Sequence, residues 1–392
     1  MTEHAFAVRP RDGFFFKDAR GWFTSASERG HSLDWPAQSS LRGALRTTVG
    51  RLLEASRGGK PFDSEAFDRE TKSVTLGATL PLRRRFGERT WSEQHRCFPV
   101  PADTLVLRDV DDIRYLQPRA PDRTVCTLGR DDDPLRESLW RVDVPPDKPA
   151  PKPRWWTNED LVAWIDRKPL KKHSPEAVRS LELTRRSDLH VGIEPSALVT
   201  GDGMLFTSET MESFSPGDGA PWEWAIGLCA TIPPSIDATC IPWTVGGDRR
   251  IANADKAPKL FEPPKFSHGA KGVRCLVVTP ALFERGWLPD GFSELDGHYR
   301  GTLPGIDGAL ELLAACIDRP LHISGWDMLH NRPKSTRRLV PAGSVYFFRK
   351  VDGSDVLAND FTEAWLAAMG RETDDGWGRV IAAPWTFDER GT

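Results

Sequence analysis

The spacing of short strands constrains the fold of this chain more than any other feature. From about residue 186 onward, apolar and β-branched runs alternate with turn residues, most clearly at 222–232 and 273–278. Helix patterns lie between these runs, but without the regular strand–helix–strand spacing of a parallel sheet. The sequence therefore predicts an α+β fold with sandwich-like layers rather than a doubly wound parallel sheet.

Other elements are predicted along the chain from the same periodicities. Further strands are expected at residues 4–9, 189–193, 204–207, 321–324, 343–349 and 379–382. One helix should begin at Ser39 or Ser40 as cap, with Leu41, Leu45, Val49, Leu52 and Leu53 as its apolar stripe. Others are expected from Thr157 or Asn158 to Ile165, at 310–317 and at 361–369. Residues 56–153 are expected to be irregular, with a Pro-rich spacer at 145–153.

The length of 392 residues suits two domains of ordinary size. We place their boundary where the pattern changes, which gives domains of residues 1–185 and 186–392. Apolar residues make up 39% of the chain and charged residues 28%, a composition typical of globular proteins. The sequence has no run of 18 apolar residues and no signal-peptide pattern at its start, so we expect a cytoplasmic protein without a membrane partner.

Metal, cofactor and catalytic chemistry have no local signature in the sequence. The six cysteines are at least eleven residues apart, so neither a CxxC pair nor a zinc knuckle forms locally. HExxH, GxSxG and GxxxxGK[ST] motifs do not occur. Asp12 and Asp18 flank a Phe-rich turn, but two carboxylates alone are a weak metal signal. We predict no metal site, no cofactor and no catalytic residue.

Charge is distributed unevenly along the chain. The net charge of −3 argues weakly against a nucleic-acid partner, but binding depends on where the charges lie. Between Arg332 and Lys350 there are six basic residues and no acid. A solvated basic surface explains this run about as well as an RNA-binding track. Because a Pro-interrupted basic loop here enters an aromatic strand, phosphate neutralisation and base stacking are both available, which favours RNA.

A glycine-rich loop at 370–379 is the second candidate site. Gly376 and Gly378 could bring backbone amides close to a phosphate, and Arg379 could supply charge. For the glycine pair alone, a tight turn is the better interpretation. Trp22 and Trp377 lie in loops beside arginines and are as suited to stacking on bases as to packing in a core.

The nine histidines are dispersed, and His190 and His330 lie nearest to basic residues. Either could act as a general base in a ribonuclease. A hydrogen-bonded structural histidine, or one that contacts phosphate, is the commoner use.

Several motifs occur in the order found in a known family. They are Asp12–Arg20, Ser39–Arg46, His190–Ile193 with Gly203–Phe206, Gly246–Arg250, Thr279–Ala281, Gly286–Pro289, Gly325–Asp327, Pro341–Tyr346 and Gly376–Arg379. The series resembles the RAMP-family subunit that caps the Cmr, or type III-B, CRISPR effector complex. Each motif alone is weak, but their order is specific. Residues 56–185 resemble the family only loosely.

The resemblance implies two ferredoxin-like (RRM-like) RAMP domains with long insertions and a glycine-rich C-terminal loop. It implies a non-catalytic subunit that binds the 5′ repeat-derived handle of the crRNA and helps to assemble the complex. The implied partners are this handle, target RNA near the handle end, the large polymerase/cyclase-like subunit and the backbone RAMP subunit, which cleaves the target. A thumb-like hairpin that displaces a base pair of the guide–target duplex is expected at a place that the sequence leaves open.

The motifs and the basic run together give a set of candidate RNA-binding residues. These are Phe15, Lys17, Arg20, Arg42, Arg46, His190, Trp326, His330, Lys334, Arg337, Arg338, Gly376, Trp377, Gly378 and Arg379. Two alternatives stay open. One is a RAMP endoribonuclease that processes CRISPR precursor RNA, which would use a positioned histidine with basic or tyrosine partners. The other is a handle-binding subunit of a related type III complex.

Overall fold

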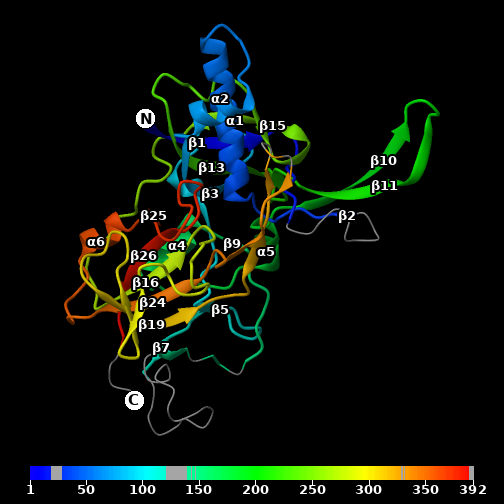
Figure 1. The fold of residues 1–392 in the computed structure, drawn as a ribbon. Helices are drawn as coiled ribbons and strands as arrows, with labels where there is room; N and C mark the ends of the chain where they lie inside the picture. Colours follow the sequence, from blue (N-terminus) through cyan, green and yellow to red (C-terminus); the bar gives the residue numbers. More distant parts are fainter. Residues whose placement is uncertain are drawn as a thin grey trace.

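A computed structural model of the chain describes residues 1–18, 29–120, 139–142, 144–145, 147–327, 330 and 332–387. Of residues 29, 201–204 and 248 only the backbone is described. The structure is mixed but rich in strands, with few helices, in agreement with the predicted α+β class. Two large antiparallel sheets organise it, one beneath helices α1 and α2 and the other beside helix α6 (Figure 1).

The first sheet has six strands, which come from two separate parts of the sequence, residues 2–85 and 214–256. Its strands are β1 (Thr2–Pro10), β3 (Thr75–Arg85), β12 (Phe214–Ser215), β13 (Trp222–Ile232), β14 (Trp243–Val245) and β15 (Arg250–Lys256). Strand β1 pairs with both β13 and β15, and β3 pairs with the other edge of β13. A domain boundary between residues 185 and 186 would therefore separate paired strands, since β1 and β3 have their partners beyond it.

Helix α1 (Gln38–Ser56) packs on this sheet through the predicted stripe. Leu41, Leu45 and Val49 are fully buried in a core that includes Phe6 and Trp224. The predicted serine cap is wrong, because the N-cap is Ala37 and makes no side-chain capping bond. The first turn is instead held by packing, which commonly outweighs local capping preference.

The prediction that residues 56–153 are irregular is wrong for helix α2 (Ser64–Thr71), which Asp63 caps, and for strand β3. Strand β3 is buried on most of both faces, so its sequence shows no alternation between apolar and polar residues. Gly77 and Pro81 inside the strand further hid it from a periodicity search.

The second sheet has the order β17-β18-β19-β24-β16-β26-β25. Its strands are β16 (Gly272–Val277), β17 (Ser293–Leu295), β18 (His298–Gly301), β19 (Leu310–Cys316), β24 (Val345–Lys350), β25 (Ala367–Ala368) and β26 (Arg379–Trp385). The helix predicted at 310–317 is wrong, because this segment is β19 and pairs with both β18 and β24. Its leucines, alanines and glutamate favour helix locally, but pairing within a sheet overrides that preference.

The helix predicted at 361–369 is only partly right. Helix α6 (Ala358–Glu363) starts earlier and ends sooner, and residues 367–368 form β25 against β26. Leu366 has a φ of 55°, which lies outside the helical region and ends any continuation.

The segment between β3 and the hairpin packs against the second sheet. It contains η1 (Glu93–His95), β4 (Cys97–Pro99), β5 (Thr104–Leu105), β6 (Arg114–Tyr115), β7 (Pro118–Arg119), β8 (Arg141–Val142), β9 (Trp155–Thr157), α4 (Asn158–Ile165) and α5 (Pro175–Ser180). Thr157 caps α4, as predicted, through a capping box with Asp160. Trp156, Leu161 and Trp164 share one buried cluster with residues of β16, β24 and β26.

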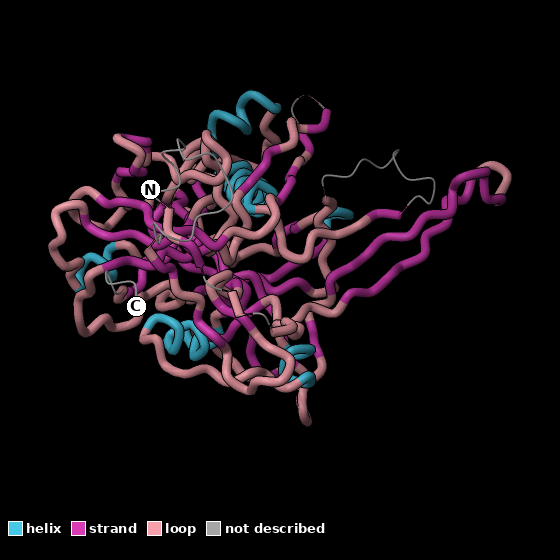
Figure 2. The backbone as a smooth tube through the Cα atoms, turned by 90° about the horizontal axis from the view of Figure 1, so that it is seen from below, coloured by secondary structure: helices cyan, strands magenta, loops and turns pink. Residues whose placement is uncertain are grey.

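A long hairpin extends away from both sheets. Strands β10 (Arg185–Glu194) and β11 (Val199–Met211) pair along their length, and β2 (Arg29–Gly30) joins them at the base. The hairpin leaves the body of the protein in both views (Figures 1 and 2). In the described parts of the chain, no helix combines the length and apolar character needed to cross a membrane.

Candidate nucleic-acid interface

Three of the sequence motifs meet around one cavity of about 530 Å³, which we call the basic cavity. Its lining residues are Ser39, Leu282, Ile323, Ser324, Asp327, Arg332, Pro333, Lys334, Ser335, Arg337, Leu339, Glu372, Asp375 and Trp377. Apart from Leu282, they come from the first turn of α1, from the basic segment at 321–339 and from the glycine-rich loop. Tertiary structure thus brings Ser39 of α1 beside segments that begin more than 280 residues later in the sequence.

Two small ladders hold the basic segment in place. Strand β20 (Leu321–Ile323) pairs with β23 (Arg337–Leu339), and β21 (Trp326–Asp327) pairs with β22 (Arg332–Pro333). The side chains of Arg332, Lys334 and Arg338 are exposed and have no hydrogen-bond or ion-pair partner among the described residues. These three cations are therefore available to an anionic ligand.

Arg337 differs from its neighbour Arg338. Its guanidinium donates to Glu372 of the glycine-rich loop at 2.6 Å, and both side chains are partly exposed. Arg337 is therefore neutralised, although no acid occurs between Arg332 and Lys350. The acid lies 35 residues further along the chain and is brought near by folding.

Trp326 and His330 lie at the outer end of the basic segment. Trp326 is 52% exposed, which leaves its indole ring accessible. His330 Nδ1 lies 2.8 Å from Asp327 Oδ2, and the His330 amide donates to the same carboxylate at 3.2 Å. An exposed tryptophan beside unpaired cations is suited to stacking on an unpaired base.

The glycine-rich loop is braced by contacts within the protein. Gly376 has a φ of 89°, and a Cβ there would lie 2.8 Å from the carbonyl oxygen of Gly77. Gly378 has a φ of 66°, its amide donates to Pro280 O at 2.9 Å, and a Cβ would collide with Met369 O. Both glycines thus allow close approach of the protein's own backbone.

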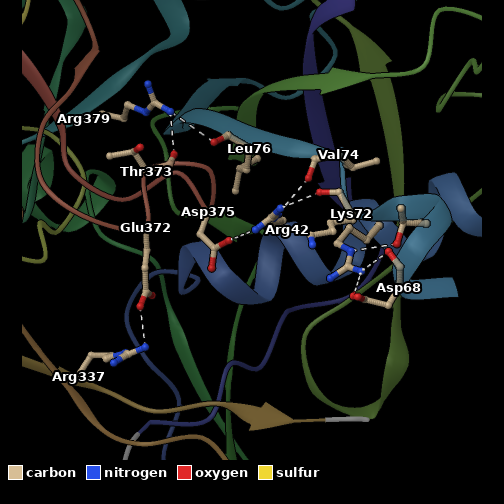
Figure 3. Close-up of polar contacts among 12 residues, drawn as sticks. Arg42, Asp68, Lys72, Val74, Leu76, Arg337, Glu372, Thr373, Asp375 and Arg379 are labelled. Atoms are coloured by element: carbon tan, nitrogen blue, oxygen red, sulfur yellow. Dashed lines mark hydrogen bonds and ion pairs between the residues drawn. The ribbon is translucent and has the colours of Figure 1, made fainter. Parts of the chain in front are cut away.

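Trp377 and Arg379 also face the protein. Trp377 is 4% exposed and packs with Ile323 and Leu339, so it is not accessible for stacking on a base. Arg379 donates to Thr373 O at 2.9 Å, and burial lowers the pKa of its guanidinium. This loop therefore places Glu372 beside Arg337 and Asp375 beside Arg42, whereas Arg379 is held by the loop's own backbone at Thr373 (Figure 3).

Replacing Gly378 by alanine should lower the free energy of unfolding by several kcal/mol, because it adds a collision with Met369 O to the cost of a positive φ. Gly353 is a matched control, since its φ is 72° but a Cβ there would meet no atom within 4 Å. Gly353→Ala should therefore cost only about 1 kcal/mol. Denaturant unfolding of the two variants measures the difference, and equal losses would show that the Met369 contact is unimportant.

Arg42 and Arg46 of α1 are engaged inside the protein as well (Figure 3). Arg42 forms an ion pair with Asp375 and donates to Val74 O at 3.0 Å and Lys72 O at 3.2 Å. Arg46 donates to Asp68 at 2.7 Å, which holds the pKa of that carboxyl below its usual range. These two arginines tie α2 and the glycine-rich loop to α1.

The other described candidates lie at or near the long hairpin. Phe15 is 4% exposed, and its carbonyl accepts a hydrogen bond from the Gly247 amide at 2.7 Å. Lys17 forms an isolated bridge with Ser32. His190 stacks on Phe206 with ring centroids 5.0 Å apart, and its Nε2 lies 2.8 Å from Ser208 Oγ. Arg20 and Trp22 lie outside the described residues.

Sequence reasoning missed the two acidic residues, Glu372 and Asp375, that line the basic cavity. Both acids lie next to the glycines in the sequence, but only the structure shows that they form ion pairs with Arg337 and Arg42. The sequence indicated Arg332 only as the first residue of the basic run, and the structure places it in the lining of the cavity. Within the described ranges, no group of three or more His, Cys, Asp or Glu side chains could hold a metal ion.

Comparisons with known proteins give a family and several distant structural likenesses. The family model described as CRISPR-associated protein (Cas_Cmr3) matches residues 6–385. A subunit of the Type III-B Cmr-beta complex bound to cognate target RNA and AMPPnP is 12% identical, with a TM-score of 0.41 and coverage of 88% of this chain and 86% of that one. A chain of the Csm3-Csm4 subcomplex of the type III-A interference complex is 8% identical, with a TM-score of 0.35 and coverage of 97% and 99%. No curated protein matches the chain.

Proposed function

The chain belongs to the Cas_Cmr3 family of CRISPR-associated proteins and is a type III effector subunit, and on that premise we propose that it binds the 5′ repeat-derived handle of the crRNA. The family match confirms the resemblance identified in the sequence. One observation carries the proposal beyond the family. The basic segment carries Arg332, Lys334 and Arg338, which no described residue neutralises, and the exposed ring of Trp326. Of these, Arg332 and Lys334 line the basic cavity.

This arrangement fits single-stranded RNA for electrostatic and geometric reasons. Guanidinium and ammonium groups bind phosphates, and an exposed indole provides a surface on which an unpaired base can stack. Glu372 and Asp375 line the other side of the cavity, where each is paired with an arginine. Among the residues that the structure describes, these ion pairs leave no free cation on that side, so the backbone of the RNA should follow the basic segment.

A ferredoxin-like core for each sheet is part of the proposal. In the first sheet the strands β3-β13-β1-β15 are adjacent, so the first and third strands in chain order are central. In the second sheet β19-β24-β16-β26 repeat this order, with α6 before the last strand. The shared order supports two βαββαβ-derived units. The long hairpin and the segment around α4 are then insertions.

The long hairpin is the segment that we propose as the thumb. Leu189 lies opposite Thr207 and Val191 opposite Leu205, so these side chains share one face of the ladder. Leu189 is 70% exposed, Val191 49% and Leu205 56%. An exposed apolar face on a projecting ladder can be inserted between stacked base pairs, since insertion removes that face from water.

Replacing residues 189–207 by an Asn-Gly turn should abolish the displacement of a base pair of the guide–target duplex and leave the rest of the protein folded. The turn would close the ladder after the Asp188–Ser208 pair, where a two-residue turn is favourable. In the reconstituted complex, 2-aminopurine placed near the handle end of the target should lose its unstacked fluorescence. Handle affinity should stay within about twofold of the wild type. Unchanged 2-aminopurine fluorescence in the shortened variant would exclude the hairpin as the thumb.

A cleavage assay separates the proposed binder from the rival endoribonuclease. The purified chain should bind labelled repeat RNA and leave it intact with or without divalent metal. His330 is the best candidate base, because Asp327 can orient its ring. Specific cleavage that disappears in His330→Ala, or in His190→Ala, would instead establish the nuclease. We propose that the protein acts as a non-catalytic assembly subunit in the cytoplasm, between the large subunit and the backbone subunit.

A further inference from the structure

A second cavity of about 490 Å³ lies at the base of the long hairpin, and we call it the hairpin-base cavity. Its lining residues are Arg11, Asp12, Gly13, Arg186, Glu212, Ser213, Phe214, Arg249, Arg250 and Ile251. It shares no lining residue with the basic cavity. Two of its segments, Asp12–Gly13 and Arg249–Arg250, belong to sequence motifs that the basic cavity does not use.

The four arginines of the hairpin-base cavity divide into two pairs. Arg186 is committed to Asp188 at 2.7 Å and to Glu212, while Arg250 donates to Gly13 O at 3.2 Å and to Thr210 Oγ1 at 3.1 Å. Arg11 and Arg249 are exposed, and their side chains have no polar partner in the part of the chain that the structure describes. The first pair therefore builds the wall, and the second pair is available for an anion.

The backbone around Arg249 is held in an unusual conformation. Gly246 has a φ of 75°, and a Cβ there would lie 2.5 Å from Phe15 O, so the chain passes very close to the N-terminal turn. Arg249 itself has a φ of 51°, a region that costs free energy for a non-glycine residue. The fold thus places this exposed arginine beside the cavity at an energetic cost.

An exposed aromatic pair borders the same cavity. Phe214 lines it and is 38% exposed, and Phe86 is 58% exposed. Their ring centroids are 5.7 Å apart and their planes meet at 68°. Phe214 lies opposite Glu223, which in turn lies opposite Arg84, so Phe86, two residues after Arg84, projects on the same face as Phe214. Edge-to-face contact with Phe86 steadies the Phe214 ring while both rings stay partly accessible.

We propose that the hairpin-base cavity binds one unpaired nucleotide of single-stranded RNA, with its phosphate on Arg11 and Arg249 and its base on Phe214. Two free guanidinium groups supply the charge for one phosphate, and a partly exposed aromatic ring supplies a surface on which any base can stack. This inference rests on the proposed role in RNA binding and adds a second contact, independent of the basic cavity. The contact is tolerant of sequence, because stacking and phosphate binding do not distinguish bases.

Ultraviolet cross-linking of the full-length chain to uridine-rich RNA, followed by peptide mapping, tests the site directly. We expect a cross-link within residues 211–217. Phe214→Ala should weaken binding of this RNA about tenfold. The same variant should bind an abasic oligonucleotide as the wild type does.

The phosphate contact is tested by the Arg11→Gln, Arg249→Asn double variant, in which asparagine tolerates the left-handed backbone at 249. The slope of log K against log salt should fall by about 0.7, the value for one lost phosphate contact on single-stranded RNA. Arg319→Gln removes an exposed arginine elsewhere and is the matched control, with no change expected. Unchanged affinity and slope in the double variant, without a cross-link in 211–217, would overturn the proposal. Normal RNA binding with failed subunit assembly would also overturn it, because the cavity would then be a protein contact.

The two proposals fail in different ways. If wild-type protein binds handle RNA and both hairpin-base variants bind it equally well, the second contact is refuted and the handle role stands. Suppose instead that the wild-type protein binds handle RNA and uridine-rich RNA equally well, and that Phe214→Ala weakens the binding of both RNAs. The handle role is then refuted and the second contact stands.

Discussion

Asp103→Ala should lower the free energy of unfolding by about 3–5 kcal/mol, because it leaves a charge buried without its partner. Asp103 and Arg274 are both 0% exposed, with Arg274 Nη1 3.4 Å from the carboxylate. Trp164 Nε1 donates to Asp103 at 2.9 Å, and Arg274 donates to Trp164 O at 2.6 Å. This network joins the segment around α4 to strand β16 of the second sheet.

Burial opposes the charge of each partner. Desolvation raises the pKa of Asp103 and lowers the pKa of Arg274 to about 10, so each ion is stabilised chiefly by the other. The double variant Asp103→Leu, Arg274→Met removes both charges together and should cost much less than Asp103→Ala alone. Denaturant unfolding followed by tryptophan fluorescence measures both. A loss below about 1 kcal/mol for Asp103→Ala would contradict the structural importance of the pair.

The triple variant Arg332→Gln, Lys334→Gln, Arg338→Gln should weaken binding of handle RNA about a hundredfold at low salt. Each lost phosphate contact should also reduce the slope of log K against log salt by about 0.7, which gives a total reduction of about 2. Fluorescence anisotropy over a salt series measures both effects. The side chains are exposed, so thermal stability should stay near that of the wild type.

Arg337 and Arg338 provide a control inside the same strand. They are adjacent in β23 and carry the same charge, but they lie on opposite faces of the strand, and Glu372 already pairs with Arg337. Arg338→Gln should therefore weaken handle binding several-fold, and Arg337→Gln should have a smaller effect. Equal effects of the two substitutions would mean that ion pairing in the free protein does not decide which arginine contacts RNA.

Local patterns were sufficient to predict several elements and the family. Strand β13 was predicted with the bounds that the structure shows, since its length and apolar run are properties of the segment itself. The Thr157 cap of α4 was also predicted, because a cap is satisfied by amides three residues away. The ordered motifs identified the family from the sequence alone, and the family match confirmed it.

Elements and contacts that depend on distant residues required the tertiary structure. The segment 310–317 has the composition of a helix but becomes β19, because two neighbouring strands supply its hydrogen-bond partners. Trp377 sits beside an arginine in a loop, yet Ile323 and Leu339 bury it. Arg337 stands in a run without acids, yet Glu372 neutralises it.

The sequence by itself therefore determined the α+β class, several of the strands and the family of this protein. The tertiary structure decided which arginines remain unpaired, which tryptophans remain exposed, and that α1, the basic segment and the glycine-rich loop surround one cavity. The physical reason is the range of the interactions. Periodicity and capping act over a few residues, whereas burial and charge neutralisation depend on whatever part of the chain folding brings within a few ångströms.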